Sequence, residues 1–226
     1  MSVTNTKLNM SAKKFAVILS GSGVYDGAEI HESVMSLYAL DLHKCTYQIF
    51  APDIKQHHVI NHITGEEMDE SRNVLLESAR IARGNIKPLA EYEVANFDVL
   101  LLPGGFGAAK NLSSFAFDGP DCKINPETEA AITATHKAGK PIGALCIAPV
   151  ILAKLIPGVE LTIGQDPGTS EAIDKMGGKS IKTKQQEVSI DRKNKVVTNS
   201  CYMLDSSLID IAEGAKNTVG ELLKLI

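Results

Sequence analysis

The chain has 226 residues, of which 44% are hydrophobic and 22% are charged, and its formal net charge is −4. This composition is typical of a folded globular protein and excludes a largely disordered or collagen-like chain. The small negative charge, with no long run of either sign, gives no support to binding of nucleic acid. No apolar stretch reaches the roughly 18 residues that a membrane span needs. Neither nucleic acid nor a membrane is therefore an expected partner.

The N-terminal segment is polar and lacks the apolar centre of a secretory signal, so residues 1–13 are predicted to be a disordered leader. Residues 14–226 contain no linker and no internal repeat, and they are predicted to form a single domain. The four cysteines stand far apart without a CxxC pair, which fits a reducing compartment. The sequence therefore predicts a cytoplasmic protein.

Short apolar runs alternate with segments of helical period, which is the pattern of a parallel sheet flanked by helices. Strands are predicted at residues 15–19, 47–51, 99–102, 142–145 and 161–163, and residues 187–190 and 196–198 are predicted to form a β-hairpin. Helices are predicted after the glycine loop 21–27, at 71–82, 126–137 and 148–155, beyond 169, and from 206 to the end, with 117–125 as a loop insertion. In the first helix the apolar positions are Val34, Leu37, Tyr38 and Leu42.

Cys146 is the strongest candidate for chemistry. It stands between an apolar strand and a following helix, in the segment GALCIAP at residues 143–149. This is the geometry of a nucleophile elbow, in which the side chain projects from the carboxyl edge of the sheet. The positive end of the following helix is expected to favour the thiolate. The alternative is that Cys146 is a small buried hydrophobic residue in a tight turn.

Other groups are expected at the same edge of the sheet. The backbone N–H groups of Gly105 and Ile147 are candidate oxyanion donors, and the alternative for the glycines is a plain strand-to-helix turn. Glu32, in the first turn of the first helix, is the candidate proton shuttle, provided that partial burial raises its pKa. The alternative is a charge that only suits the helix dipole. Asp26 and His31 are candidate substrate-binding residues.

Two patterns that suggest cofactors are weaker. The loop Gly21–Gly27 follows a strand as in a dinucleotide site, but Asp26 stands where the fingerprint needs a glycine. His57, His58 and His62 give one i, i+4 pair without an obvious third metal ligand. We therefore predict no cofactor and no metal site.

Cys201 follows the predicted hairpin. If the end of that strand borders the site, Cys201 and Cys146 are candidates for a reversible disulfide. Such a bond requires their Cα atoms to lie within about 7 Å of each other.

Three segments together resemble a known family. They are SGSGVYDGAEIHE at residues 20–32, LPGGFGAAKNL at 102–112 and GALCIAP at 143–149. They are similar to the ElbB family of isoprenoid biosynthesis glyoxalases, in the PfpI superfamily of class I glutamine amidotransferase-like proteins. The likeness extends from about residue 14 to the C-terminus. It implies a flavodoxin-like three-layer α/β sandwich with a mostly parallel central sheet and an added β-hairpin, and a homodimer.

The resemblance also implies roles for individual residues. Cys146 matches the nucleophile of the superfamily, and Glu32 matches the glutamate that hydrogen-bonds it. Gly105 and Ile147 match the positions that supply oxyanion N–H groups.

One departure from the superfamily pattern bears on the reaction. After the strand at 161–163, where many members have a histidine, this chain has Gly164, Gln165 and Asp166. A Cys-His-Glu triad for peptide or glutamine hydrolysis is therefore not expected, unless His31 supplies the imidazole from the other side.

The leading prediction is a cofactor-independent glyoxalase that acts on glyoxal or a similar small dicarbonyl. Cys146 would form a hemithioacetal, and Glu32 would move a proton between the two carbons, giving glycolate from glyoxal. The alternative is a regulatory or interaction protein of isoprenoid metabolism with only incidental thiol reactivity. Amidotransferase activity ranks third.

Overall fold

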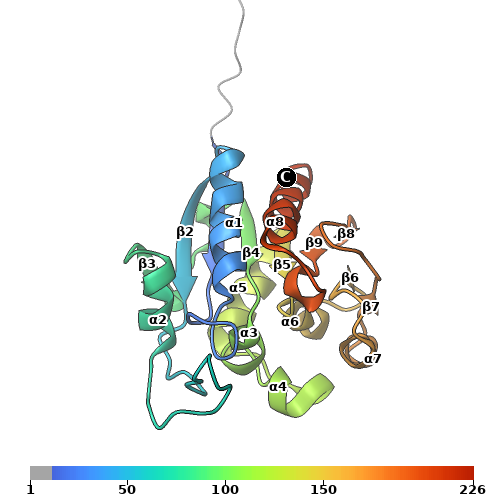
Figure 1. The fold of residues 1–226 in the computed structure, drawn as a ribbon. Coiled ribbons are helices and arrows are strands. Elements are labelled where there is room, and N and C mark those ends of the chain that lie inside the picture. The colour runs from blue at the N-terminus through green and yellow to red at the C-terminus, as the bar shows by residue number, and fades with distance from the viewer. Residues whose placement is uncertain (1–11) are drawn as a thin grey trace, which may run out of the picture.

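The computed structural model describes residues 12–226, so the predicted leader at residues 1–13 lies outside it except for its last two residues. The middle layer is a seven-stranded sheet of order β3-β2-β1-β4-β5-β9-β8 (Figure 1). Its strands are β1 Lys14–Ile18, β2 Thr46–Ala51, β3 Ile86–Pro88, β4 Val99–Leu102, β5 Ile142–Leu145, β8 Val188–Asp191 and β9 Val196–Asn199. Neighbouring strands are parallel except for β8 and β9, which form the predicted antiparallel hairpin at one edge.

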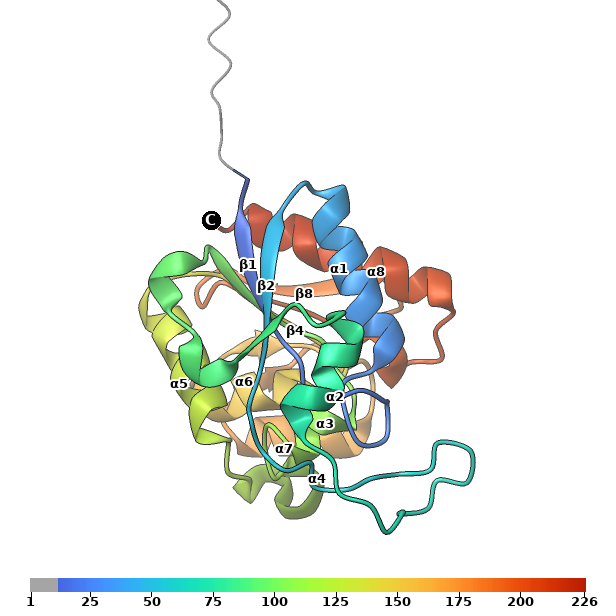
Figure 2. The same cartoon turned by 90° about the vertical axis from the view of Figure 1, so that its left-hand side faces the viewer.

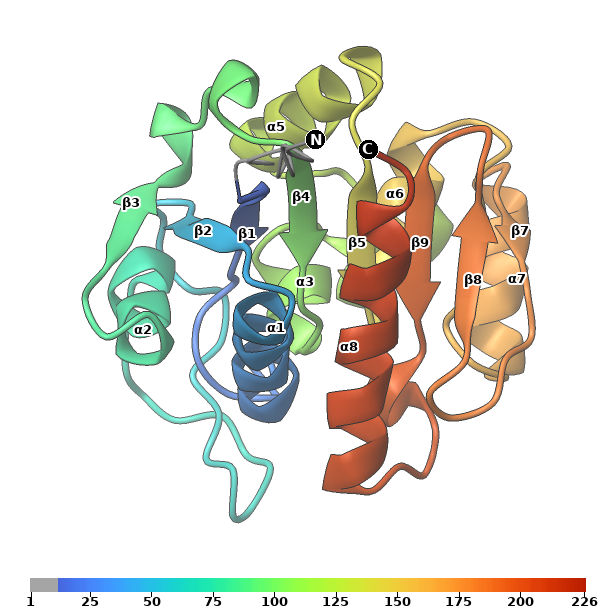
Figure 3. The ribbon, with the colours of Figure 1, turned by 90° about the horizontal axis from the view of Figure 1, so that it is seen from above.

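Helices cover both faces of this sheet. Figure 3 shows α1 Ile30–Leu42, α2 Val74–Ile81 and α8 Leu208–Leu223 on one face, with α5 Pro126–Lys137 and α6 Pro149–Leu155 on the other. The remaining α-helices are α3 Phe106–Lys110, α4 Phe115–Asp118 and α7 Pro167–Lys175, and short 3-10 helices span Leu89–Glu91, Val94–Asn96, Gly119–Asp121 and Cys201–Met203. The predicted three-layer α/β sandwich is confirmed. Within residues 12–226 no helix combines the length and apolar character needed to cross a bilayer.

The central strands form the core. All four residues of β4 are at most 1% exposed, and so are Ile142, Ala144 and Leu145 of β5. Strand β4 has no polar residue because helices cover it on both faces, as predicted. The carboxyl ends of β1, β4 and β5 point the same way, so the loops that follow them meet at one edge, where α3 and α4 lie (Figure 1).

Most of the predicted apolar positions of α1 face away from the sheet, whereas Leu40 is fully buried. Val34, Tyr38 and Leu42 are 43%, 51% and 48% exposed, and only Leu37 of the predicted set is half-buried. The buried side carries small residues such as Ser36 and Ala39. Small side chains let α8 pack closely beside α1, as Figures 1 and 2 show. The helical spacing of these apolar residues predicted the helix correctly but did not identify its buried face.

Several short elements differ from the prediction. The segment predicted as a strand at 161–163 is β6, Glu160–Leu161, and it pairs with β7, Lys179–Ser180, in a separate two-stranded sheet. Strands β3 and β7 were not predicted, because a strand of only two or three residues is too short to show an alternation of apolar and polar positions. The loop insertion at 117–125 includes the end of α4 and a 3-10 helix.

Candidate active site

Cys146 occupies the sharp turn between β5 and α6, as the elbow pattern predicted. Its φ of +56° lies in the left-handed region, which residues with a Cβ seldom adopt. Pro149 begins α6 three residues later, where its missing N–H costs little. The turn holds the thiol at the carboxyl edge of the sheet, and Cys146 is only 7% exposed.

The carboxyl group of Glu32 lies against this thiol and hydrogen-bonds to it. Glu32 is 0% exposed. Its Oε2 accepts from the Gly104 N–H at 3.0 Å, and its Oε1 accepts from the Tyr202 N–H at 3.4 Å. Burial, assisted by the nearby charge of Glu29, raises the pKa of Glu32 to about 8. Glu32 is therefore mostly protonated at neutral pH and is suited to exchange a proton near that pH.

Glu29 holds the first turn of α1. It is the N-cap of the helix, and its Oε2 accepts from the Glu32 N–H at 2.6 Å. Its Oε1 lies 4.0 Å from Nδ1 of His31, and that nitrogen lies 2.9 Å from the hydroxyl of Tyr202. His31 thus contacts the site through Tyr202, and its imidazole does not line the cavity beside Cys146.

The two predicted oxyanion donors converge. The backbone N–H groups of Gly105 and Ile147 both hydrogen-bond to the sulfur of Cys146. Gly105 has a φ of +98°, and a Cβ there would collide with the backbone at Glu29. Glycine at this position is what allows the loop after β4 to approach α1 so closely.

The pKa of the Cys146 thiol is raised, not lowered as the helix dipole suggested. Burial is the largest cause and the carboxylate of Glu32 is the second, while the N–H groups of Gly105 and Ile147 act in the opposite direction. Helix α6 has only seven residues, and its field does not offset the loss of water around the sulfur. At neutral pH the thiol therefore keeps its proton until Glu32 accepts it.

A cavity of about 330 Å³ opens beside Cys146. Its wall is mainly apolar and comes from separate parts of the chain: Val24, Gly105, Phe106, Ala109, Phe115, Ala116, Cys146, Ile147, Asp166, Thr169, Tyr202 and Met203. Of the predicted site residues, Cys146, Gly105 and Ile147 line it. The sequence analysis missed the others, and only Asp166 had a local signal, as the cap of α7. A larger groove of about 890 Å³ lies beside α8, and none of the described residues that line it is a cysteine or a serine.

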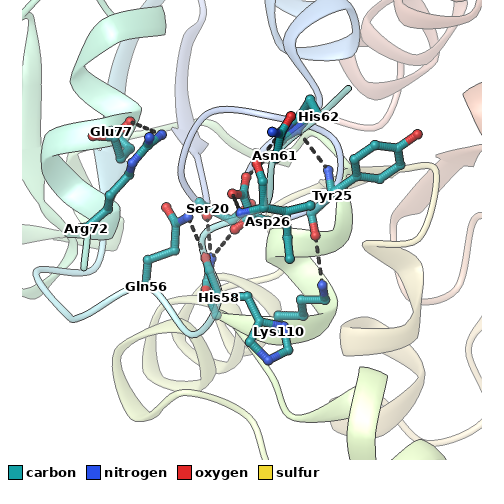
Figure 4. A network of polar contacts seen from close by, with 12 residues as sticks. Ser20, Tyr25, Asp26, Gln56, His58, Asn61, His62, Arg72, Glu77 and Lys110 are labelled. Carbon is teal, nitrogen blue, oxygen red and sulfur yellow. Dashed lines mark hydrogen bonds and ion pairs between the residues drawn. The ribbon is translucent and has the colours of Figure 1, made fainter. Parts of the chain in front are cut away.

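Asp26 lies outside this cavity, in the polar network of Figure 4. Its Oδ2 accepts from the Ile60 N–H at 2.7 Å, and its Oδ1 is 3.9 Å from Nε2 of His62. That same nitrogen accepts from the Tyr25 N–H at 3.2 Å. The structure therefore does not bring Asp26 to the cavity beside Cys146, because its carboxylate holds the loop after β2 against the glycine loop.

The other two histidines pack on an aromatic ring. His57 and His58 contact each other and Phe117, with ring centroids 4.3 to 5.6 Å apart. No group of three or more His, Cys, Asp or Glu side chains suited to a metal ion occurs between residues 12 and 226.

Cys201 is a neighbour of Cys146. The backbone N–H of Cys146 donates to the carbonyl of Asn199, two residues before Cys201, at 2.9 Å, and both cysteines are free thiols. Burial raises the pKa of the Cys201 thiol as well. Because both thiols are free, a disulfide between Cys146 and Cys201 stays a prediction.

Solved structures place this fold in a known class. The chain is similar to an isoprenoid biosynthesis protein with an amidotransferase-like domain from Ehrlichia chaffeensis, with a TM-score of 0.87 and 38% identity over 94% of this chain and 100% of that one. Glyoxalase III from Candida albicans shares the fold, with a TM-score of 0.61 and 14% identity over 95% of this chain and 97% of that one. The likeness to the Ehrlichia structure defines the class of this fold as an amidotransferase-like domain.

Relatives identify the family, although no protein-family model matches the chain. Human "glutamine amidotransferase-like class 1 domain-containing protein 3, mitochondrial" is 49% identical over 224 residues, covering 95% of this chain and 84% of the human protein. Rat "ES1 protein homolog, mitochondrial" is 49% identical over 222 residues, covering 94% and 84%. The chain belongs to this glutamine amidotransferase-like, ES1 family, and the predicted resemblance is confirmed.

The same relatives contradict the predicted cytoplasmic location, because both are named mitochondrial proteins. That prediction relied on cysteines that fit a reducing compartment and on the lack of an apolar secretory centre near the N-terminus. Mitochondrial transit peptides are amphipathic and rich in Arg and Ser, so this criterion does not detect them.

Proposed function

We propose that the protein is a cofactor-independent glyoxalase, converting glyoxal or a similar small dicarbonyl into a 2-hydroxy acid. One observation supports this above all: a thiol, a carboxyl group with a pKa of about 8 and two backbone N–H groups meet at one point beside a cavity. Two similar solved structures support the proposal. One is a glyoxalase III with the same fold, and the other is an isoprenoid biosynthesis protein.

The first step joins Cys146 to the aldehyde. Ionised Glu32 takes the thiol proton while the sulfur bonds to the aldehyde carbon, and the π electrons of the carbonyl move to its oxygen. The N–H groups of Gly105 and Ile147 stabilise that oxyanion. Protonated Glu32 then returns the proton to the oxygen, which completes a hemithioacetal.

The second step moves a hydrogen between two carbons. Glu32 removes the hydrogen of the former aldehyde carbon as a proton, and the electrons of that bond form an enediolate with the negative charge on the oxygen of the neighbouring carbonyl. Glu32 returns the proton to the neighbouring carbon, and the proton of the hemithioacetal hydroxyl passes to the neighbouring oxygen, so that the carbon bonded to sulfur becomes a carbonyl. The product is a thioester of a 2-hydroxy acid. Water cleaves the carbon–sulfur bond and restores the Cys146 thiol. The net reaction adds one water to the dicarbonyl, and no external oxidant or reductant is consumed.

Proton NMR of the purified protein with excess glyoxal tests this proposal. We expect many equivalents of glycolate per protein, and a loss of at least ~10³-fold in Cys146→Ser. Cys122→Ser is the matched control, because this buried thiol lies away from the cavity and its loss should leave turnover intact. At most one equivalent of glyoxal consumed, without glycolate, would overturn the proposal.

That outcome would favour the second candidate, a regulatory or interaction protein of isoprenoid metabolism. The raised pKa of Cys146 supports this alternative, because a protonated thiol is a weak nucleophile.

A further inference from the structure

The second step of the proposed reaction places negative charge on a second oxygen. The N–H groups of Gly105 and Ile147 are directed at the sulfur of Cys146, so they serve the oxygen on the carbon that bonds to this sulfur. The enediolate carries its charge on the oxygen of the neighbouring carbon, one carbon further from the sulfur. Because Cys146 and Glu32 are buried, a charged oxygen beside them needs a hydrogen-bond donor of its own.

Few side chains of the cavity wall are able to donate to that oxygen. Apart from the Cys146 thiol, the polar side chains among the described residues of the wall are Asp166, Thr169 and Tyr202. Asp166 is a carboxylate, because hydrogen bonds from the backbone and side chain of Thr169 lower its pKa. The side chain of Thr169 is engaged by Asp166, so the hydroxyl of Tyr202 is the remaining donor.

Tyr202 lies next to the reacting pair. It belongs to the 3-10 helix Cys201–Met203, between β9 and α8, and its backbone N–H donates to Oε1 of Glu32 at 3.4 Å. Tyr202 is half-buried and lines the same cavity as Cys146. Its side chain therefore begins beside the carboxyl group that moves the proton.

His31 holds the hydroxyl of Tyr202. Nδ1 of His31 lies 2.9 Å from the hydroxyl oxygen, and the two ring centroids are 5.9 Å apart. Oε1 of Glu29 lies 4.0 Å from the same Nδ1, and its negative charge favours the tautomer with the proton on that nitrogen. In this tautomer Nδ1–H donates to the oxygen of Tyr202. The hydroxyl proton of Tyr202 is then available to a bound ligand.

We propose that Tyr202 is a further catalytic residue, whose hydroxyl donates a hydrogen bond to the second oxygen of the enediolate, and that His31 and Glu29 are positioning residues that direct this hydroxyl. The proposal rests on the proposed glyoxalase function and adds a residue to it. Tyr202 keeps its proton throughout, so no bond forms or breaks at Tyr202 and the balance of the reaction is unchanged. His31, predicted from the sequence as a substrate-binding residue, acts through Tyr202 instead.

Tyr202→Phe tests the donor, because it removes the hydroxyl and keeps the ring. We expect kcat for glyoxal to fall about 100-fold and KM to change less than about threefold, since the hydroxyl acts on the enediolate and not on the bound aldehyde. Tyr92→Phe is the matched control, because the hydroxyl of Tyr92 is also hydrogen-bonded, to Thr135 at 2.7 Å, but Tyr92 does not line the cavity. An unchanged kcat, or a loss confined to KM, would overturn the proposal.

Two variants test the positioning role of His31. His31→Asn places an amide N–H near the position of Nδ1 and should keep kcat within about threefold of wild type, whereas His31→Leu removes the donor and should lower kcat about 10-fold or more. Adding His31→Leu to Tyr202→Phe should lower kcat by less than a further twofold or so, because His31 acts only through the hydroxyl. Equal losses in His31→Asn and His31→Leu, or multiplied losses in the double variant, would contradict the role of His31.

Failure of the glyoxalase function would be recognisable as an absence of glycolate in the wild type as well as in every variant. Binding of acetohydroxamate, a planar analogue of an enediolate, then tests Tyr202 by itself and is followed by NMR titration. A Kd at least about 10-fold weaker in Tyr202→Phe and unchanged in Tyr92→Phe supports the proposal. Absence of binding to the wild type, or equal Kd values in the wild type and Tyr202→Phe, overturns it.

Discussion

Glu32 is a buried carboxyl group whose two oxygens accept from two backbone N–H groups and which also hydrogen-bonds to the Cys146 thiol. Because its pKa is raised to about 8, the form able to accept the thiol proton accumulates as the pH approaches that value. We expect kcat/KM for the dicarbonyl to rise with pH and level off above about pH 8. Glu32→Gln should lower kcat/KM by about 100-fold or more and abolish the rise.

The measurement is a pH–rate profile of wild type and Glu32→Gln under identical buffers. Glu77→Gln serves as the control, because Glu77 is also buried but is paired with Arg72 and Arg80 away from the cavity. The same rising limb in Glu32→Gln would show that another group controls it.

Gly104 determines how closely the thiol and Glu32 approach each other. A Cβ at this position would lie 2.6 Å from Oε2 of Glu32 and would also overlap the Cys146 side chain. Gly104→Ala should therefore lower activity at least about tenfold and cost roughly 1 to 3 kcal/mol of unfolding free energy, because the overlap must be relieved by shifting buried atoms. Turnover and urea unfolding measure the two effects. Gly220→Ala is the control and should keep full activity, because Gly220 is half-buried in α8 and a Cβ there would make only an ordinary contact with His43 at 3.5 Å.

At the scale of elements, α1 presents an apolar stripe that the sheet does not bury. Val34, Tyr38 and Leu42 lie four residues apart and are each about half exposed. We predict that this stripe is the contact face of the homodimer that the family resemblance implies. Charges placed there by Val34→Glu and Tyr38→Glu should raise the dimer dissociation constant at least about tenfold.

Sedimentation equilibrium measures this dissociation constant. Ile63→Glu is the control, because Ile63 is 95% exposed in the loop after β2 and lies off the stripe. A dimer that survives both α1 substitutions unchanged would place the interface elsewhere.

At the scale of the whole molecule, the sequence could predict features that depend on neighbouring residues of one segment, but not features that depend on contacts between separate segments. The apolar run of β4 and the turn at Cys146 are local patterns, so the sheet and the elbow were predicted correctly. The cavity wall was not, because Phe115, Asp166 and Met203 are brought together only by the packing of separate loops. The same limit applies to the thiol pKa, which depends on burial by distant segments more than on the adjacent helix.

Burial of Glu32 also links the stability of the whole fold to pH. Its pKa is about 8 in the folded protein against 4.5 as the reference for the unfolded chain, so the folded state binds more protons between these values. The stabilisation of the folded state by the proton on Glu32 is complete below about pH 4.5. It is lost as the pH rises towards 8, and the unfolding free energy falls by no more than about 1.4 kcal/mol per pH unit.

Glu32→Gln removes this proton linkage. We expect the unfolding free energy of the variant, relative to wild type, to increase by about 2 to 3 kcal/mol between about pH 5.5 and about pH 7.5. Urea unfolding at the two pH values measures it, and taking the difference between the two proteins cancels the titration of the histidines. Parallel pH dependence in wild type and variant would mean that Glu32 is already ionised in the folded protein at neutral pH, and it would remove the basis for its role as an acid near pH 8.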